Sequence, residues 1–418
     1  MKLAFTCFIS LLLAACGGSG GGPAAPQSLS ATAGTPVPPS PASPVAPAPT
    51  VPVTPSTSVP PNPAGPSTLP SGVVESDYYP LVTQLHLSYF GGAADYYGFT
   101  YFSKRYLIDG MPLSGKELEA ALPGNERVAE AVSVFAKSPI SGAFYSGTEE
   151  AQLEKMFRTL FNRAPDSTEK AKWRTRLETG QLDRNHLPLA LMNSAAGADL
   201  QVLGKKLALS GAYSLALSIP PQPMESWQYD ASRSLLAAVD QAADETLFAP
   251  LAQAAARRFE SEAYAPPAPP PPGSSHGFSS YKFLPAAVLM CATKAGKSSV
   301  ADYLVAGKAV PIREAAGLAA QRFAVLREDC PLTSSGRSFS FDAAGNATLT
   351  TPAASVQFAA AQVSQALKGE AMVDTVFKRS VKLQAYSVAT ADGGKAYVLI
   401  EKSLANGTAE ETLAAWTQ

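Results

Sequence analysis

Three residues near the middle of the chain have types and a spacing that could hold a ligand: Arg163, Asp166 and Trp173. An arginine and a carboxylate beside an aromatic ring can hold a sugar or an anion. In a simpler interpretation, which we favour, Asp166 caps a helix, Arg163 braces the turn before it, and Trp173 is a core residue. We therefore keep these three residues as the candidate binding site and expect them to have structural roles.

Other short motifs in the chain are incomplete. Residues 291–298 resemble a phosphate-binding loop, but Cys291 stands where that loop needs its first glycine. The three histidines are far apart, without the spacing of a zinc site, and we expect His86, set among Leu85, Leu87 and Tyr89, to lie at a core edge. The sequence thus predicts no metal, cofactor or catalytic residue. A pair of carboxylates for glycan hydrolysis stays open, because any two acids can meet in a fold.

The N-terminus has the pattern of an export signal. Lys2 precedes an apolar run from Leu3 to Leu13, which is the length of a signal-peptide core and too short to cross a bilayer. The run ends in Leu13-Ala14-Ala15-Cys16. In this pattern small residues fit a narrow protease cleft, and the Cys16 thiol can take a lipid. The alternative is an ordinary cleaved signal with an incidental cysteine.

These residues resemble the lipobox of bacterial lipoproteins. The resemblance implies cleavage before Cys16, lipidation of its thiol, and usually acylation (palmitate, for example) of the new N-terminus. Several acyl chains on one residue make a stable membrane anchor. Gly17 follows the cysteine in place of the aspartate that retains some lipoproteins in the inner membrane. The resemblance therefore implies a protein anchored in the outer membrane that faces the periplasm or the cell surface.

Two proline-rich stretches divide the chain. Residues 16–72 hold the lipidated cysteine and a Pro-, Gly- and Ser-rich stretch that is too poor in apolar surface to fold. As a coil such a linker spans on the order of 40 Å. A second proline-rich linker covers 265–276, which leaves domains at 73–264 and 277–418 after a signal peptide at 1–15. The net charge of −1 offers no basic surface for nucleic acid.

The cysteines that remain after export form one predicted pair. Cys7 leaves with the signal peptide and Cys16 takes the lipid, which leaves Cys291 and Cys330 in one domain. An oxidising compartment favours a disulfide between them. The bond would close a loop of about 40 residues, worth about 4 kcal/mol in the chain-entropy model. A metal or redox pair would need closer spacing or further ligands.

The middle domain reads as a helical duplication. Apolar residues of 149–163 fall at helical spacing on one face, with Ser146 and Glu149 as an expected capping box and Asp166 with Glu169 as the next cap. Residues 85–95 align with 156–166, so that two copies of helix, Asp-capped turn and helix follow each other. The aligned pairs are Phe90 with Phe161, Ala93 with Ala164, Asp95 with Asp166, and Phe102 with Trp173. Asp183 precedes a further apolar stretch at 187–192, and later helices are expected at 200–217, 232–243 and 245–263.

The second copy resembles a bacterial family named as domain of unknown function 4214. The resemblance rests on residues 157–166, then Trp173, Gly180 and Asn193-Ser194. It covers 153–195 well and about 75–260 loosely, and it implies a helical, extracytoplasmic domain without an established activity. Glu169 stands where the family has glycine; the first copy keeps Gly98 there but has Gly92 in place of the arginine.

The last domain changes to an alternating pattern that predicts an antiparallel sheet. Residues 338–342 and 347–350 flank a turn at 342–346, and 381–388 and 395–401 flank Asp392-Gly393-Gly394. We expect a helix over 356–367 and a short last element over 411–416. The 280–328 region has no clear pattern.

These observations predict a multi-domain chain: a mainly α-helical duplicated domain, then a small α+β domain with an antiparallel sheet, after a disordered N-terminal linker. For function we expect an envelope lipoprotein that acts as an interaction or adhesin-like module, without enzymatic activity. Its expected partners are the membrane, through the lipid on Cys16, and an envelope protein or surface glycan. Two alternatives remain: an envelope glycan or peptidoglycan hydrolase, and an inert structural spacer.

Overall fold

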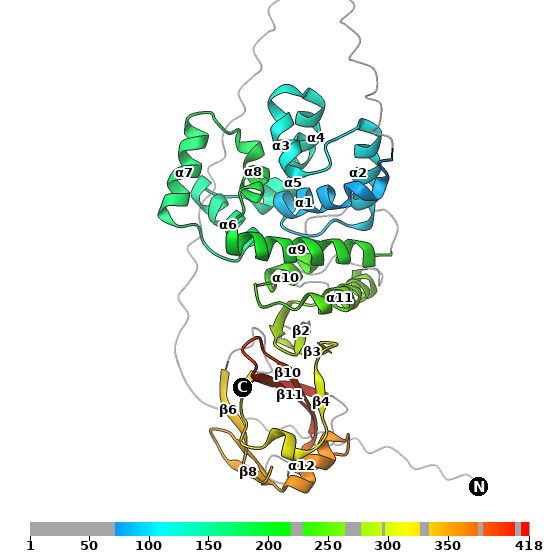
Figure 1. The fold of residues 1–418 in the computed structure, drawn as a ribbon, viewed down its shortest axis with the longest axis vertical. Helices are drawn as coiled ribbons and strands as arrows, with labels where there is room; N and C mark the ends of the chain where they lie inside the picture. Colours follow the sequence, from blue (N-terminus) through cyan, green and yellow to red (C-terminus); the bar gives the residue numbers. More distant parts are fainter. Residues whose placement is uncertain are drawn as a thin grey trace, which may run out of the picture. The chain divides into compact units, whose positions relative to one another are not determined.

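The computed structural model describes residues 72–218, 229–263, 277–294, 297–326, 334–374, 379–405 and 411–417 (Figure 1). The signal peptide, Cys16, nearly all of the first linker, the second linker and Cys330 lie outside these ranges. The predictions made for them therefore stay predictions.

The described chain has the predicted fold class, with a helical region followed by antiparallel sheets. Its first part is built from α1 (Tyr79–Phe90), α2 (Tyr96–Asp109), α3 (Gly115–Ala121), α4 (Glu126–Ala136), α5 (Pro139–Phe144), α6 (Glu149–Phe161), α7 (Ser167–Glu178), α8 (Leu187–Asn193), α9 (Gly197–Ala216), α10 (Tyr229–Ala237) and α11 (Phe248–Ala263). The predicted helix over 232–243 is therefore shifted: it begins earlier, at Tyr229, and ends at Ala237.

The duplication is visible in the helix boundaries. Helices α1 and α6 both end on a left-handed residue, Gly91 and Asn162, which are 71 residues apart. Helices α2 and α7 both begin after a capping aspartate, Asp95 and Asp166, again 71 residues apart. The order α1 to α4 is thus repeated by α6 to α9, with α5 between the two sets (Figure 1).

Local capping explains where the second copy starts. Thr148, and not the predicted Ser146, caps α6, because its hydroxyl accepts a hydrogen bond from the Ala151 N–H. That correction shifts the cap by two residues toward the helix and leaves the helix face unchanged. Asp166 caps α7 as predicted, in a capping box with Glu169.

Helix α1 lies at the centre of the helical core. Nine of its twelve residues are buried, and such all-round burial marks a helix enclosed by others. Helix α9 packs on α1, α6 and α11, so it joins both copies to the following helices (Figure 1). His86 of α1 is 1% exposed among the rings of Phe90, Phe102 and Phe135. It is therefore a core residue and not a core-edge residue.

Two antiparallel sheets follow. The smaller has the order β1-β2-β3 and the larger the order β4-β10-β11-β12-β5-β6-β7-β8, with β9 paired to β10. Their bounds are β1 (Ser280–Leu284), β2 (Ala287–Lys294), β3 (Lys297–Val305), β4 (Val310–Ile312), β5 (Arg322–Leu326), β6 (Ser334–Phe341), β7 (Ala347–Thr350), β8 (Ser355–Phe358), β9 (Met372–Asp374), β10 (Arg379–Ala389), β11 (Lys395–Ala405) and β12 (Glu411–Thr417). Both predicted hairpins are present, as β6–β7 and β10–β11.

One predicted element in this part is wrong at its start. Residues 356–367 were expected to be helical, but Val356 and Phe358 lie in β8, and α12 spans only Ala360–Leu367. The two apolar residues alternate with polar ones and pair with β7, which is the period of a strand. Helix α12 packs against β10 and buries Val363 and Leu367 in the core of the larger sheet.

The smaller sheet has two apolar faces. Tyr281, Val288 and Met290 belong to the same core as the helices, whereas Leu289 and Val300 pack with residues of β10 and β11. Lys308 also forms an ion pair with Asp244, with Nζ 2.8 Å from Oδ2. The strands that begin the predicted 277–418 domain therefore share a core with the helices that precede it.

Candidate functional site

In the structure, the Arg163 side chain braces the turn before α7 by binding Glu169 and Asp199. Its guanidinium donates to both oxygens of Glu169 at 2.6 and 2.7 Å, and to both oxygens of Asp199 at 2.6 and 2.8 Å. The Ala164 carbonyl accepts a fifth bond at 3.2 Å. A guanidinium has five N–H donors, so none is left for an external anion or sugar. The bonds to Glu169 and Asp199 raise the pKa of Arg163, and Arg163 lowers the pKa of Glu169.

Asp166 and Trp173 are engaged as well. The Asp166 carboxylate accepts the Glu169 N–H at 2.8 Å, and the Trp173 side chain is only 2% exposed. The cations of Lys172 and Arg176 lie 5.4 and 4.9 Å from the tryptophan ring centre. The predicted candidate residues are therefore close together, but each takes the structural role that the simpler interpretation gives it.

The same turn in the first copy keeps the capping aspartate, Asp95, but has no counterpart of the Arg163–Glu169 pair. Gly92 and Gly98 occupy the places of Arg163 and Glu169. A Cβ on Gly98 would lie 2.6 Å from Asp95 Oδ1 and 3.0 Å from His86 Nε2, so this site has no room for a side chain. In the second copy Glu169, in place of this glycine, binds Arg163.

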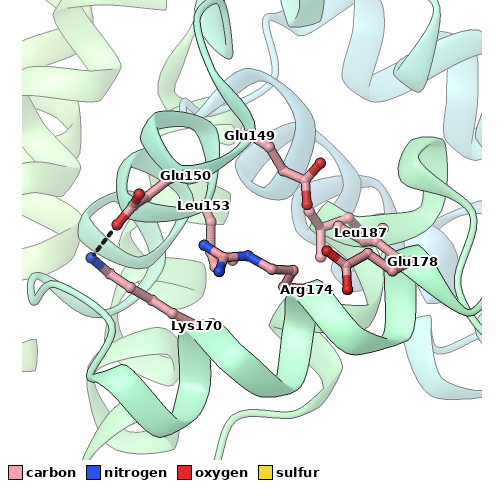
Figure 2. A pocket seen from close by; sticks show the side chains of 8 residues that line it. Glu149, Glu150, Leu153, Lys170, Arg174, Glu178 and Leu187 are labelled. Carbon is pink, nitrogen blue, oxygen red and sulfur yellow. Dashed lines mark hydrogen bonds and ion pairs between the residues drawn. The ribbon is translucent and has the colours of Figure 1, made fainter.

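An open pocket lies between α6 and α7 of the second copy (Figure 2). Its volume is about 210 Å³, and it combines charged walls with an apolar base. The lining residues are Glu149, Glu150, Leu153, Lys170, Arg174, Leu177, Glu178 and Leu187. Leu153 and Leu187 are 6% and 2% exposed, so the base of the pocket belongs to the helical core.

Two ion pairs flank this pocket. Lys170 Nζ lies 2.7 Å from Glu150 Oε1, and Arg184 Nη2 lies 2.5 Å from Glu149 Oε2. Hydrogen bonding by Lys170 lowers the pKa of Glu150, and the charges of Lys170 and Arg174 add to this effect. The Glu150 carboxylate is therefore held in its ionised form and is a poor proton donor.

Arg174 and Glu178 also line the pocket and remain available. Within the described part of the chain neither side chain makes an ion pair or hydrogen bond. Figure 2 shows the Arg174 guanidinium between the Glu150–Lys170 pair and the carboxylates of Glu149 and Glu178. The pocket thus offers one cation and one anion to an incoming ligand.

The first copy has aromatic rings at the corresponding positions. Tyr79 and Phe99 stand 71 residues before Glu150 and Lys170, and their ring centres are 4.4 Å apart. Tyr78, the counterpart of Glu149, is 1% exposed and packs edge-on against Tyr106. The second copy therefore has charged side chains at positions where the first copy has aromatic rings in contact.

Two further hollows lie nearby. An apolar groove of about 470 Å³ between α1, α2 and α9 has Tyr79, Phe99, Leu207 and Leu215 among its lining residues. A more open one lies beside Asn193, whose amide donates to the Gly115 carbonyl and to Glu119 at 2.8 Å each. Asn193 thus ties α8 to α3.

A buried lysine is a feature that the sequence analysis missed. Lys206 of α9 is fully buried, and its ammonium donates to the Thr159 carbonyl at 2.5 Å and to Asn162 Oδ1 at 2.6 Å. Burial lowers the pKa of Lys206 to about 7. The ammonium meets the C-terminal end of α6, where the helix dipole favours a cation, so it fastens α6 to α9.

Neither a metal centre nor a membrane span is found within the described ranges. No group of three or more His, Cys, Asp or Glu side chains there could hold a metal ion. No described helix is both long and apolar enough to cross a bilayer. Comparison with known protein families, curated proteins and solved structures finds no match to this chain. The two family resemblances therefore stay expectations.

The α6–α7 pocket was also not foreseen from the sequence. Its signal is nevertheless present in the alignment of the two copies, where Tyr78, Tyr79 and Phe99 correspond to Glu149, Glu150 and Lys170. Charges that replace aromatic residues at aligned positions indicate that the two copies use this cleft differently.

Proposed function

We propose that this protein is an exported, lipid-anchored binding module, and that the α6–α7 pocket holds a charged group of an envelope polymer. The anchor is the lipid on Cys16, in the outer membrane, and the proline-rich stretch that follows is the tether. The helical duplication is the binding part, and the second copy carries the site.

One observation carries this proposal: the second copy has the ion pair Glu150–Lys170 where the first copy has the aromatic contact Tyr79–Phe99. Burial of a side chain such as Phe99 stabilises a fold by about 1.5–3 kcal/mol. The pair that replaces Tyr79 and Phe99 is solvent-exposed, with Glu150 56% and Lys170 31% exposed, and exposed ion pairs stabilise little. A sequence that loses stability at an open, charged cleft is typical of a binding site.

The two rival functions make different demands on the same pocket. A glycan hydrolase needs a carboxylic acid with a raised pKa as its proton donor, whereas Lys170 lowers the pKa of Glu150. An inert spacer gives no reason for the exchange of aromatic residues for charges. A binding module accounts for both features.

A pelleting assay tests the proposal. The purified full-length chain, in mild detergent, is mixed with washed peptidoglycan sacculi and with whole envelopes and then centrifuged. We expect the protein in the pellet with no sugar released into the supernatant. The variant Arg174→Ala should remain in the supernatant, whereas Lys172→Ala, which removes the same charge from α7 outside the pocket, should still pellet.

Three results would contradict the proposal. Released sugar would identify a hydrolase and direct attention to Glu149 and Glu178. Equal pelleting of both variants would move binding away from this pocket. If the wild-type chain pellets with neither material, the remaining functions are binding of a protein partner and an inert spacer.

A further inference from the structure

We infer that the α6–α7 pocket recognises a zwitterionic group, with Arg174 binding its carboxylate and Glu178 binding its ammonium. This inference rests on the proposed function, because it names the ligand class of the same site. The probe is an amino acid with both charges free, of the kind found in the peptide arms of peptidoglycan.

The placement of Arg174 and Glu178 supports this assignment. They are four residues apart on α7, so their side chains leave the same helix face about one turn from each other. Both line the pocket, and their charged ends lie near its centre and right edge in Figure 2. Arginine can bind a carboxylate through two parallel N–H bonds, which gives this end of the site its geometry.

The remaining charges of the pocket are already paired. Glu150 binds Lys170, and Glu149 binds Arg184, which reaches it from the segment before α8. With these pairs neutralised, Arg174 and Glu178 leave no net charge. A neutral pocket attracts neither a polyanion nor a polycation, but it complements a ligand that carries one charge of each sign.

The size and base of the pocket restrict the ligand further. A volume of about 210 Å³ is below the range of about 300–1,000 Å³ typical of sites for drug-sized ligands. It suits an amino-acid-sized group better than a sugar chain. Leu153, Leu177 and Leu187 form an apolar floor on which the ligand's methylene groups can lie. Water excluded by that floor would strengthen both ionic contacts.

Calorimetric titration of the full-length chain tests the inference. The probes are free diaminopimelate, whose two ends are both zwitterionic, its N,N′-diacetyl form and its dimethyl ester. We expect saturable binding of the free form and at least tenfold weaker binding of each blocked form. Arg174→Gln should abolish the difference between the free acid and the ester, and Glu178→Gln the difference between the free amine and the acetylated form. Lys172→Gln should behave as wild type.

The outcomes separate this inference from the proposed function. The chain could pellet with sacculi and yet bind the free and blocked probes equally, or bind no probe at all. Either result would overturn the zwitterion assignment and leave the binding module standing. Probe binding that depends on Arg174 and Glu178 without pelleting would support the assignment and overturn the polymer as ligand. If the chain neither pellets nor binds the probe, both the zwitterion assignment and the proposed function are overturned.

Discussion

Lys170 Nζ lies 2.7 Å from Glu150 Oε1, and this ion pair joins α7 to α6 beside the open pocket. The first copy joins its corresponding helices through Tyr79 and Phe99, with ring centres 4.4 Å apart. The same helical frame thus holds a packed aromatic contact in one copy and a charged opening in the other. This difference between otherwise parallel helix pairs is the basis of the functional proposal.

Removal of the Arg163 brace should destabilise the second copy. Arg163→Ala leaves the carboxylates of Glu169 and Asp199 without their shared partner, which should cost about 1–2 kcal/mol of unfolding free energy at this partly exposed site. Arg163→Lys should recover only part of the loss, because a single ammonium cannot replace five planar N–H donors. Urea unfolding measures both values.

Arg158 provides the control for that experiment. It is 61% exposed, and among the described residues it pairs only with Glu154 on its own helix, so Arg158→Ala should change stability by less than about 0.5 kcal/mol. Equal losses for the Arg163 and Arg158 variants would refute the role of Arg163 as a brace.

His86 should make the fold sensitive to acid. Burial lowers its pKa to about 4, although the Val82 carbonyl contact opposes this, whereas an unfolded histidine has its pKa near 6.5. Between these values the unfolded chain binds more protons than the folded chain. The unfolding free energy should therefore fall by about 3 kcal/mol as the pH falls from 6.5 to 4.

The variant His86→Phe should lose this part of the pH dependence. Urea unfolding at several pH values measures it, with His186→Gln, a change at a half-buried histidine outside the aromatic cluster, as control. A slope between pH 4 and 6.5 that is the same in His86→Phe and in the wild type would show that His86 does not cause it.

The lipid anchor predicts a change of cell fraction. Cys16→Ser removes the thiol that takes the lipid, so the exported chain should move from the membrane to the soluble fraction. Cys7→Ser should have no such effect, because Cys7 leaves with the signal peptide. Cell fractionation, with mass spectrometry of the N-terminal peptide, gives the answer, and an unchanged membrane fraction for Cys16→Ser would argue against the anchor.

A disulfide between Cys291 and Cys330 predicts one linked peptide. Cys291 is 1% exposed in β2, and Cys330 lies in the stretch 327–333, outside the described ranges. Digestion without reductant should release the two cysteines in one peptide, and reduction should lower the unfolding free energy by about 4 kcal/mol. If both thiols of the denatured, unreduced chain react with a maleimide, the predicted bond is absent.

The sequence was most informative where short-range chemistry determines structure. Asp95 and Asp166 cap their helices as their position before apolar, periodic residues predicts, and Asp392-Gly393-Gly394 forms the turn between β10 and β11. The start of α6 and the strand at Val356 were misplaced. Thr148 and Ser146 are both good caps, and a short apolar run fits a helix as well as a strand.

The pocket and the buried ties could not be predicted from local patterns. Asp199 reaches Arg163 from 36 residues away, and Lys206 reaches Asn162 from 44 residues away, so both contacts depend on how α9 packs across the second copy. Glu150 and Lys170 look like ordinary solvated helix residues in the sequence. What distinguishes them from such residues is that they face each other across α6 and α7, at the positions that Tyr79 and Phe99 occupy in the first copy.

The most direct test of the central claim is to restore the aromatic pair of the first copy in the second. The double variant Glu150→Tyr, Lys170→Phe should close the α6–α7 pocket and raise the melting temperature by about 2–4 °C, because it buries apolar surface. We predict that this more stable protein no longer pellets with sacculi or envelopes that bind the wild-type chain. A stabilised double variant that still pellets like the wild type would contradict the account, because binding would then not need the pocket.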